Sequence, residues 1–364
     1  MPSDRPQAAR DAPPRSVTVP LALLALGAAA AALRAAAVVT LPVAAALTAA
    51  VLLLPVQTGI ARRVPKRVRW LGTAAAMGTF VLALGAIVGA AWWAVALTAG
   101  RLPEYRERFE AAWSGVRSWL EARNVPVDRL GEGGGLAERA ASWAGGGLMT
   151  AGEVAVGIVI VFFLTMLFLM EAGRWREKSR RAWEDRRGLL EETAALIAHK
   201  VRQYLVARTL VSAISAVASG LFLWIAGVEL ALVWALLVFV LNYIPNIGSI
   251  LSALPPILFA FVQSGWGLGA VVAGGLLAIE QVIGNYVDPR IQGRTLDISP
   301  AVVLVAVLFW TFVWGPVGAL LAVPATVSIL VAAAQVPGAR WAAVMLSNDT
   351  EIPLADGRRG ARAG

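Results

Sequence analysis

The sequence lacks cysteine altogether and contains a single histidine among its 364 residues. The absence of cysteine excludes disulfides, thiolate metal sites and cysteine nucleophiles. A lone histidine, His199, with neither cysteine nor a carboxylate pair beside it does not indicate a metal site, so we expect no metal and no other cofactor. The chain also lacks a G-x-S-x-G elbow, a G-x-x-x-x-G-K phosphate loop and an H-E-x-x-H motif, which argues against an enzyme.

Charged residues are scarce as well. They make up 15% of the chain, whereas hydrophobic residues make up 58%; an ordinary soluble domain has roughly 25% charged residues. This composition leaves too little polar surface for a water-soluble protein. Most of the long apolar runs approach the ~20 residues that a helix needs to cross the hydrocarbon. They span residues 17–33, 35–55, 71–99, 154–170, 205–227, 230–262, 265–286 and 301–334. We therefore expect an all-α, polytopic membrane protein with about eight membrane segments.

The net charge of +9 comes from basic residues in short blocks beside the apolar runs. Residues 62–69 and 174–187 are the two densest blocks. Such blocks are typical of cytoplasmic loops, since lysine and arginine are enriched on that side of a membrane. The pattern indicates anchoring to a lipid bilayer rather than binding to nucleic acid, and it predicts that both chain ends are cytoplasmic.

The segment 100–147 is the most polar part of the chain between two apolar runs. Between residues 102 and 120 its apolar side chains recur at three- and four-residue steps among charged ones, which predicts an amphipathic helix. We expect this helix to lie on the external membrane surface or against a neighbouring subunit. A lid that captures substrate is the alternative. The sequence GEGGG at 131–135 then forms a flexible joint.

One apolar run is interrupted by LNYIPNIGSILSALPP, residues 241–256. Pro245 cannot donate to a helical ladder, and its ring clashes with the preceding turn. The twelve residues 230–241 would make a helix of about 18 Å, too short to span a bilayer, and 249–262 is similar. Two half-length helices joined by NYIPNIG predict a re-entrant hairpin, which needs protein or water around its unwound backbone.

A second segment, WGPVGALLAVPA at 314–325, has the same design. Residues 247–251 can be laid over 317–321, and one uninterrupted span precedes each broken segment. If each hairpin returns to its own side, the two units form an inverted repeat, with the connector 288–299 on the cytoplasmic side. Interrupted segments at matching places in two halves are typical of a transporter's binding site. Two ordinary kinked spans are the alternative.

Polar residues form two stripes within the apolar part. Arg208, Ser212, Ser215 and Ser219 lie at steps of four, three and four, so they share one helix face. Gln281, Asn285 and Asp288 do the same further along, with Glu280 adjacent. Such groups at membrane depth usually face the interior of the bundle. The predicted pathway combines both stripes and both breaks: Arg208, Ser212, Ser215, Asn242, Pro245, Asn246, Gly248, Ser249, Gln281, Asn285, Gly315, Gly318 and Pro324.

Glu280 and Asp288 are the candidates for coupling to a proton or another ion. Structural alternatives exist for several of these residues. Arg208 lies about one turn from the cytoplasmic surface and could extend its charge to the surface, and the serines could bond their own helix. Glu280 could form an ion pair with Arg290 or Arg294.

The ordered motifs NYIPNIG, PRIQGRTLDISP and GPVGALLAVP resemble the C-terminal half of the autoinducer-2 exporter (AI-2E) family, whose members are bacterial inner-membrane proteins. The family's I-P-x-x-G motif falls on Ile244, Pro245 and Gly248. The two later motifs fall on Pro289, Ile291 and Gly293, and on Gly315, Gly318, Ala322 and Pro324. Asp288 departs from the family pattern, which has an apolar or amide residue there, and this leaves the identity of the solute open.

The resemblance implies export of a small, polar, uncharged signalling molecule in some members and cation/proton antiport in others. It also implies a homo-oligomer, specifically a pentamer. We therefore expect a secondary transporter that exports a small polar solute through the broken helices. The alternatives are a cation/proton antiporter and a non-transporting oligomeric scaffold. The expected divisions are helices one to three (1–99), the external helix and linker (100–150), helix four (151–172), a basic cytoplasmic segment (173–203), the transport core (204–336) and a cytoplasmic tail (337–364).

Overall fold

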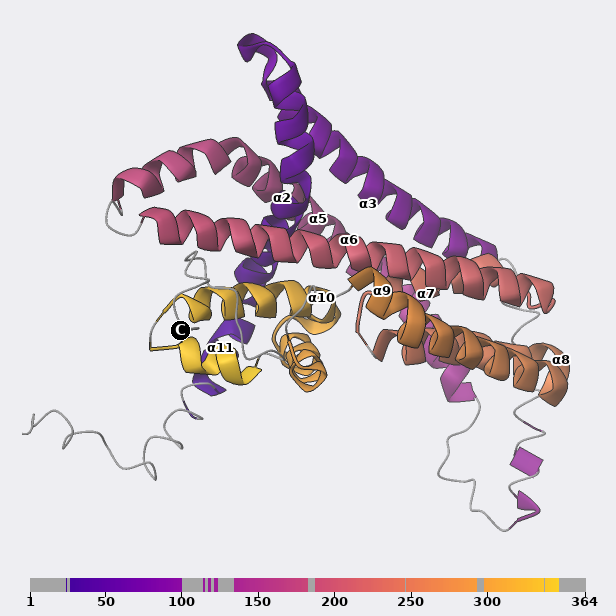
Figure 1. The fold of residues 1–364 in the computed structure, drawn as a ribbon. Coiled ribbons are helices and arrows are strands. Elements are labelled where there is room, and N and C mark those ends of the chain that lie inside the picture. The colour runs from indigo at the N-terminus through magenta and orange to yellow at the C-terminus, as the bar shows by residue number, and fades with distance from the viewer. Residues whose placement is uncertain are drawn as a thin grey trace, which may run out of the picture.

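The computed structural model describes residues 24, 27–99, 114, 117–118, 121–123, 134–182, 187–245, 247–292, 298–336 and 338–346. Helices account for nearly all of this part of the chain (Figure 1). Six stretches are long and apolar enough to cross a membrane: Ala37–Arg63, Lys66–Ala94, Val154–Trp175, Gly188–Ile225, Ile247–Gln292 and Pro300–Ala334. The all-helical prediction is confirmed for the described residues. The count of eight segments stays a prediction, and most of the expected amphipathic helix at 102–120 lies outside the described residues.

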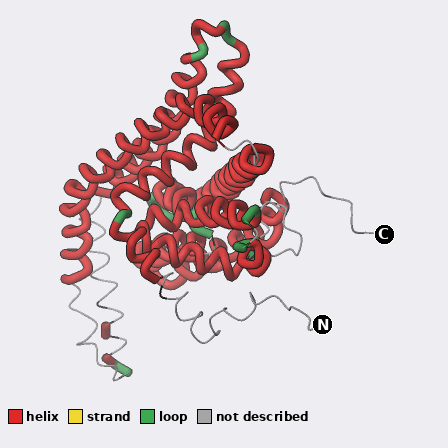
Figure 2. Tube along the Cα trace, turned by 90° about the vertical axis from the view of Figure 1, so that its left-hand side faces the viewer, coloured by secondary structure: helices red, strands yellow, loops and turns green. Residues whose placement is uncertain are grey.

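The N-terminal part is a bundle of α2 (Ala37–Arg63), α3 (Trp70–Ala99) and α5 (Gly134–Ala182). A turn at Ala36 separates α2 from a helical stretch at 27–35. The basic residues between α2 and α3 include the short helix η2 (Lys66–Val68), and this end of the pair projects beyond the other helices (Figure 2). Gln57 Nε2 donates to Thr73 Oγ1 at 2.9 Å and to the Leu169 carbonyl at 3.0 Å, so one partly buried amide joins all three helices.

Helix α6 (Arg187–Ile225) connects this bundle to the C-terminal part. It runs across most of the width of the molecule (Figure 1) and contacts α2, α5, α7, α8, α9 and α10. Its first half carries several charged side chains, whereas its second half is mainly apolar except for a polar stripe that begins at Arg208. Because so many elements pack on α6, its polar face becomes enclosed by protein.

The first predicted break is a hairpin. Helix α7 (Ala231–Leu241) ends at Asn242, and α8 (Ile247–Val282) begins after the turn. Trp234 packs against Phe259 with tilted rings whose centroids are 5.4 Å apart, so the two arms lie side by side. Gln263 joins the ends of the two arms that lie away from the turn, here called the feet of the hairpin. Its Oε1 accepts from the Glu229 backbone N–H at 2.9 Å, and its Nε2 donates to the Gly227 carbonyl at 2.8 Å. The second arm ends there, because Ser264 and Gly265 leave the helical conformation.

The second predicted break is also a hairpin, contained within α10 (Pro300–Ala334). Gly315 has φ 65° and ψ −154°, a conformation that is accessible to glycine but strained for other residues. Trp310 Nε1 donates to Thr326 Oγ1 across the two arms at 3.0 Å, so these arms lie side by side as well. The short helix α11 (Arg340–Leu346) follows and packs on α10.

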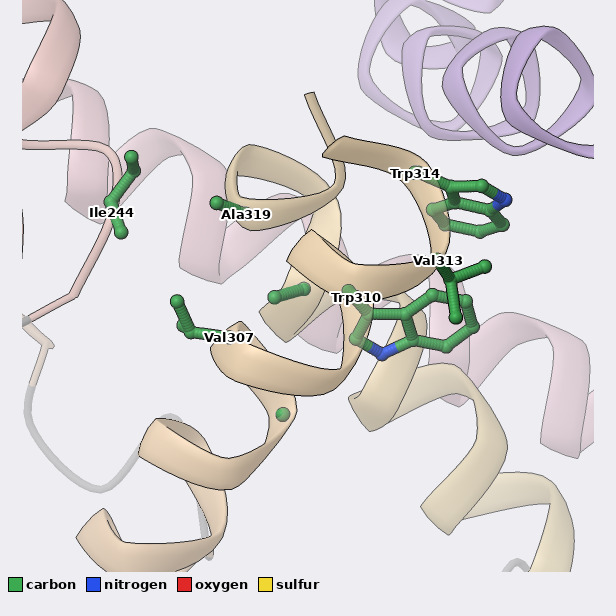
Figure 3. Packing of buried hydrophobic residues seen from close by; sticks show 8 residues of the cluster. Ile244, Val307, Trp310, Val313, Trp314 and Ala319 are labelled. Carbon is green, nitrogen blue, oxygen red and sulfur yellow. The ribbon is translucent and has the colours of Figure 1, made fainter. Parts of the chain in front are cut away.

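The tips of the two hairpins meet in an apolar cluster. Ile244, from the first turn, faces Val307 and Ala319 of α10 (Figure 3), and Trp310 and Trp314 stack beside them with centroids 4.2 Å apart. Trp314 Nε1 also donates to Thr40 Oγ1 of α2 at 3.0 Å. The cluster therefore fixes the first break against both the second hairpin and the N-terminal bundle.

Candidate functional site

The polar stripe predicted on α6 is present and buried. Arg208 is 5% exposed, and Ser212, Ser215 and Ser219 are at most 1% exposed. Protein therefore encloses the Arg208 guanidinium almost completely. The stripe faces the first hairpin because α6 and α7 pack along their lengths. Two of its side chains, Arg208 and Ser215, therefore meet Asn242 at the turn between α7 and α8.

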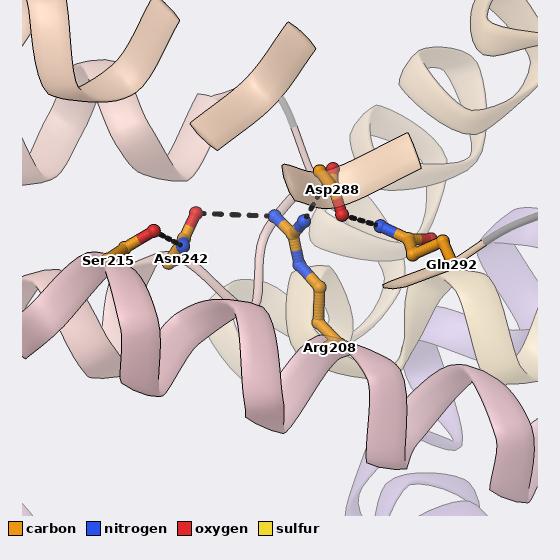
Figure 4. Close-up of polar contacts among 5 residues, drawn as sticks. All are labelled: Arg208, Ser215, Asn242, Asp288 and Gln292. Carbon is orange, nitrogen blue, oxygen red and sulfur yellow. Dashed lines mark hydrogen bonds and ion pairs between the residues drawn. The ribbon is translucent and has the colours of Figure 1, made fainter. Parts of the chain in front are cut away.

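A chain of polar contacts connects α6, the first break and α9 (Asp288–Gln292) (Figure 4). Asn242 Nδ2 donates to Ser215 Oγ at 3.0 Å, and Arg208 Nη2 donates to Asn242 Oδ1 at 3.4 Å. Arg208 Nη1 lies 3.5 Å from Asp288 Oδ2, and Gln292 Nε2 donates to Asp288 Oδ1. The guanidinium of Arg208 thus holds the C-terminal end of α7 and the start of α9 together.

A cavity of about 270 Å³ lies beside this chain of contacts. Its polar wall combines one guanidinium, two carboxylates and several neutral groups, and its apolar wall comes from α6, α8, α10 and the connector. The lining residues are Tyr204, Arg208, Val211, Asn242, Pro245, Ser249, Glu280, Ile283, Gly284, Asp288, Gln292, Ile298, Pro300, Val303 and Val323. A cavity of this size and polarity suits a small polar molecule or a hydrated ion.

A π-helical turn separates α8 from α9 and changes the register between Glu280 and Asp288. Residues Ile283–Val287 form the π-helix η4, whose wider turn shifts the register of the side chains that follow. Asp288, the first residue after this turn, lines the cavity together with Glu280 and Gly284. Gln281 and Asn285 instead lie on the exposed side, where Asn285 Nδ2 donates to Gln281 Oε1 at 2.7 Å. The structure therefore does not bring these two amides to the other predicted residues.

The second break is likewise not part of the cavity wall. Gly318 is buried next to Trp310, in the apolar cluster that receives Ile244, Gly315 forms the turn just before it, and Pro324 is fully buried. The second hairpin reaches the cavity through Pro300, Val303 and Val323. Asn246 lies outside the described residues. In this conformation the cavity belongs to the first break and the connector rather than to both breaks.

Two cavity residues with polar side chains, Tyr204 and Gln292, were missed by the sequence reasoning. Tyr204 lies one turn before Arg208 on the same face of α6, so extending the stripe by four residues would have found it. Gln292 lies four residues after Asp288 and binds it. Its sequence signal was weak because glutamine in a connector has no distinctive spacing.

Comparisons with known proteins agree with the resemblance of the motifs. A family model described as AI-2E family transporter matches residues 21–338. The protein named AI-2 transport protein TqsA from Escherichia coli K12 is 34% identical over 324 residues, which cover 87% of this chain and 91% of that protein. A protein of Haemophilus influenzae named as a transport protein is 39% identical over 145 residues, 40% of this chain and 42% of its own length. A sodium-lithium/proton antiporter of Halobacillus andaensis is 28% identical over 161 residues, 42% of this chain and 44% of that protein.

Proposed function

Since the chain belongs to the AI-2E family of membrane transporters, we propose that it exports a small polar solute through the cavity beside the first break. The candidate solute is autoinducer-2 or a molecule of similar size and polarity. The name of the Escherichia coli relative supports this choice. So does the size of the cavity, about 270 Å³, which limits the solute to a compact molecule.

The observation that carries the proposal is the buried polar chain from Ser215 through Asn242 and Arg208 to Asp288. Polar and charged side chains are costly inside a membrane protein, and they are retained there mainly where they serve a pathway. Here they converge on the place where α7 ends and backbone groups leave the helical ladder. Such a combination of unwound backbone and polar side chains is how broken-helix transporters hold their solutes.

We further propose that the two helix-plus-hairpin units have inverted orientations. The feet of the first hairpin then lie outside, and the connector after α9 lies inside. Single cysteines at Ser264 and Arg290, both exposed, test this in a chain that has no native cysteine. A membrane-impermeant thiol reagent should label Ser264→Cys only from outside and Arg290→Cys only from inside. Labelling of both from one side would contradict the inversion.

Asn242→Ala should strongly reduce solute flux in proteoliposomes, by about tenfold or more. The substitution removes a donor to Ser215 and an acceptor for Arg208, and a buried hydrogen bond to a charged group contributes roughly 1.5–3 kcal/mol. Flux of labelled autoinducer-2 measures the effect, and Asn285→Ala is the matched control because this amide lies away from the cavity. Normal flux in Asn242→Ala would move the pathway elsewhere or favour the non-transporting scaffold.

Cation/proton antiport is a second candidate, supported by the two carboxylates of the cavity and by the similarity to a sodium-lithium/proton antiporter. The same proteoliposomes distinguish the two functions when flux is measured with and without a pH gradient. Antiport predicts gradient-driven lithium or sodium flux that Glu280→Gln removes. Autoinducer-2 flux that Glu280→Gln leaves unchanged, with no cation flux, would exclude it.

A further inference from the structure

Three buried polar atoms on one face of α6 have no hydrogen-bond partner among the described residues. They are Tyr204 Oη, Arg208 Nε and Ser212 Oγ. Tyr204 is 2% exposed and Ser212 is fully buried. Removing such groups from water without a new partner is unfavourable, and buried polar groups in folded proteins are nearly always paired. A run of three on one helix face therefore indicates that something other than the described protein groups satisfies them.

Two of the three atoms belong to cavity residues and the third does not. Tyr204 and Arg208 line the cavity, whereas Ser212 is absent from its wall. Tyr204 and Arg208 are four residues apart on a helix, so their side chains project to the same side. Each Nη of Arg208 already has a partner, Asp288 for Nη1 and Asn242 for Nη2, whereas Nε–H has none among the described residues.

The charges around these atoms restrict the ligand. The positive charge of Arg208 is offset by Asp288 at 3.5 Å, and Glu280 adds a second carboxylate to the same wall. The cavity therefore offers no excess positive charge for a carboxylate or phosphate. An Arg N–H can only donate a hydrogen bond, whereas a Tyr hydroxyl can donate or accept. A solute hydroxyl, which also does both, is the group that matches this pair.

We propose that Tyr204 Oη and Arg208 Nε form the subsite that binds the hydroxyl groups of a neutral solute, with Tyr204 as a specificity-determining residue. The proposal rests on the proposed function, because it assumes that the solute occupies this cavity. It adds Tyr204, a residue to which neither the motifs nor the relatives assign a role, as the group that sets the selectivity. The selectivity is for neutral, hydroxyl-bearing molecules over anions of the same size.

Tyr204→Phe and Ser212→Ala provide a matched test on purified protein. Both substitutions remove an unpartnered buried hydroxyl, so neither should lower the melting temperature without ligand. Glycerol, erythritol and ribose serve as neutral probes, and ribonate serves as the anionic one; stabilisation against heating reports binding. We expect a neutral probe to stabilise the wild type, with a half-saturating concentration about tenfold higher in Tyr204→Phe and unchanged in Ser212→Ala. Ribonate should stabilise none of the three proteins.

Several results would overturn the subsite. One is an equal response of both variants, which would mean that water alone satisfies these hydroxyls. Another is stabilisation by ribonate equal to that by ribose. A third is that no neutral probe stabilises the wild type. The assay needs no transport, so it separates the two proposals. Selective loss of binding in Tyr204→Phe without flux in proteoliposomes would support the subsite and contradict the transport function.

Discussion

Gly248→Ala is expected to prevent the first hairpin from closing. A Cβ at this position would overlap the carbonyl oxygen of Leu241, and one at Gly318 would overlap the carbonyl oxygen of Trp310. Overpacking typically costs about 1–3 kcal/mol, and both sites should reach the upper end or exceed it because the neighbour is backbone rather than a side chain that can rotate. Thermal unfolding and size-exclusion profiles in detergent measure the loss for Gly248→Ala and Gly318→Ala.

Gly274→Ala is the control for this pair. Gly274 also lies in α8, but a Cβ there meets nothing within 4 Å, and alanine is the better helix former. This variant should be at least as stable as the wild type. Equal stability of Gly248→Ala and Gly274→Ala would show that the two arms of the hairpin do not approach each other as the structure describes.

Arg208→Met should cause the largest functional loss, at least a hundredfold in solute flux. Methionine keeps most of the buried volume but removes the contacts to Asn242 and Asp288. Removing one partner of a buried ion pair costs about 3–5 kcal/mol, and the lower end applies because the Asp288 side chain is 26% exposed. Unfolding midpoints and flux in proteoliposomes measure the two effects.

The double variant Arg208→Met, Asp288→Asn separates stability from transport. Neutralising Asp288 removes the unpaired carboxylate, so the double variant should recover stability relative to Arg208→Met without recovering flux. If flux returned together with stability, Arg208 would be needed only for folding and would have no part in the pathway. Asn285→Ala again serves as the control for a polar residue outside the cavity.

The sequence located both breaks because the chemistry that causes them is local. Pro245 cannot donate to a helix, and Gly248 and Gly318 leave room for a carbonyl oxygen, so each hairpin is encoded within a few residues. The stripe on α6 was predictable for the same reason: a regular helix places residues at steps of three and four on one face. These features depend only on neighbours along the chain.

The composition of the cavity depended on features that spacing does not reveal. A regular period puts Asp288 beside Gln281 and Asn285, but the π-helix Ile283–Val287 changes this register, and Asp288 lines the cavity without the two amides. The ion pair between Arg208 and Asp288 joins residues far apart in sequence, whereas reasoning from neighbours offered only an alternative pairing of Glu280 with Arg290 or Arg294. Spacing could not predict that the second break lies in an apolar cluster. The cluster forms only when Ile244 of the other hairpin packs against the tryptophans of α10.

The glutamine that joins the feet of the first hairpin has a mechanical consequence. Gln263, near the end of the second arm, forms hydrogen bonds with backbone groups of Gly227 and Glu229, just before α7. Leu230 at φ 59° and Gly265 at φ 75° interrupt the helices at the same end of the hairpin. The hydrogen bonds of Gln263 therefore couple the two arms into one rigid unit, and the interrupted backbone at its open end provides the hinges. A solute that pulled on Asn242 at the tip would displace α7 and the first part of α8 together, and the force would be delivered to the ends of α6 and of the second part of α8.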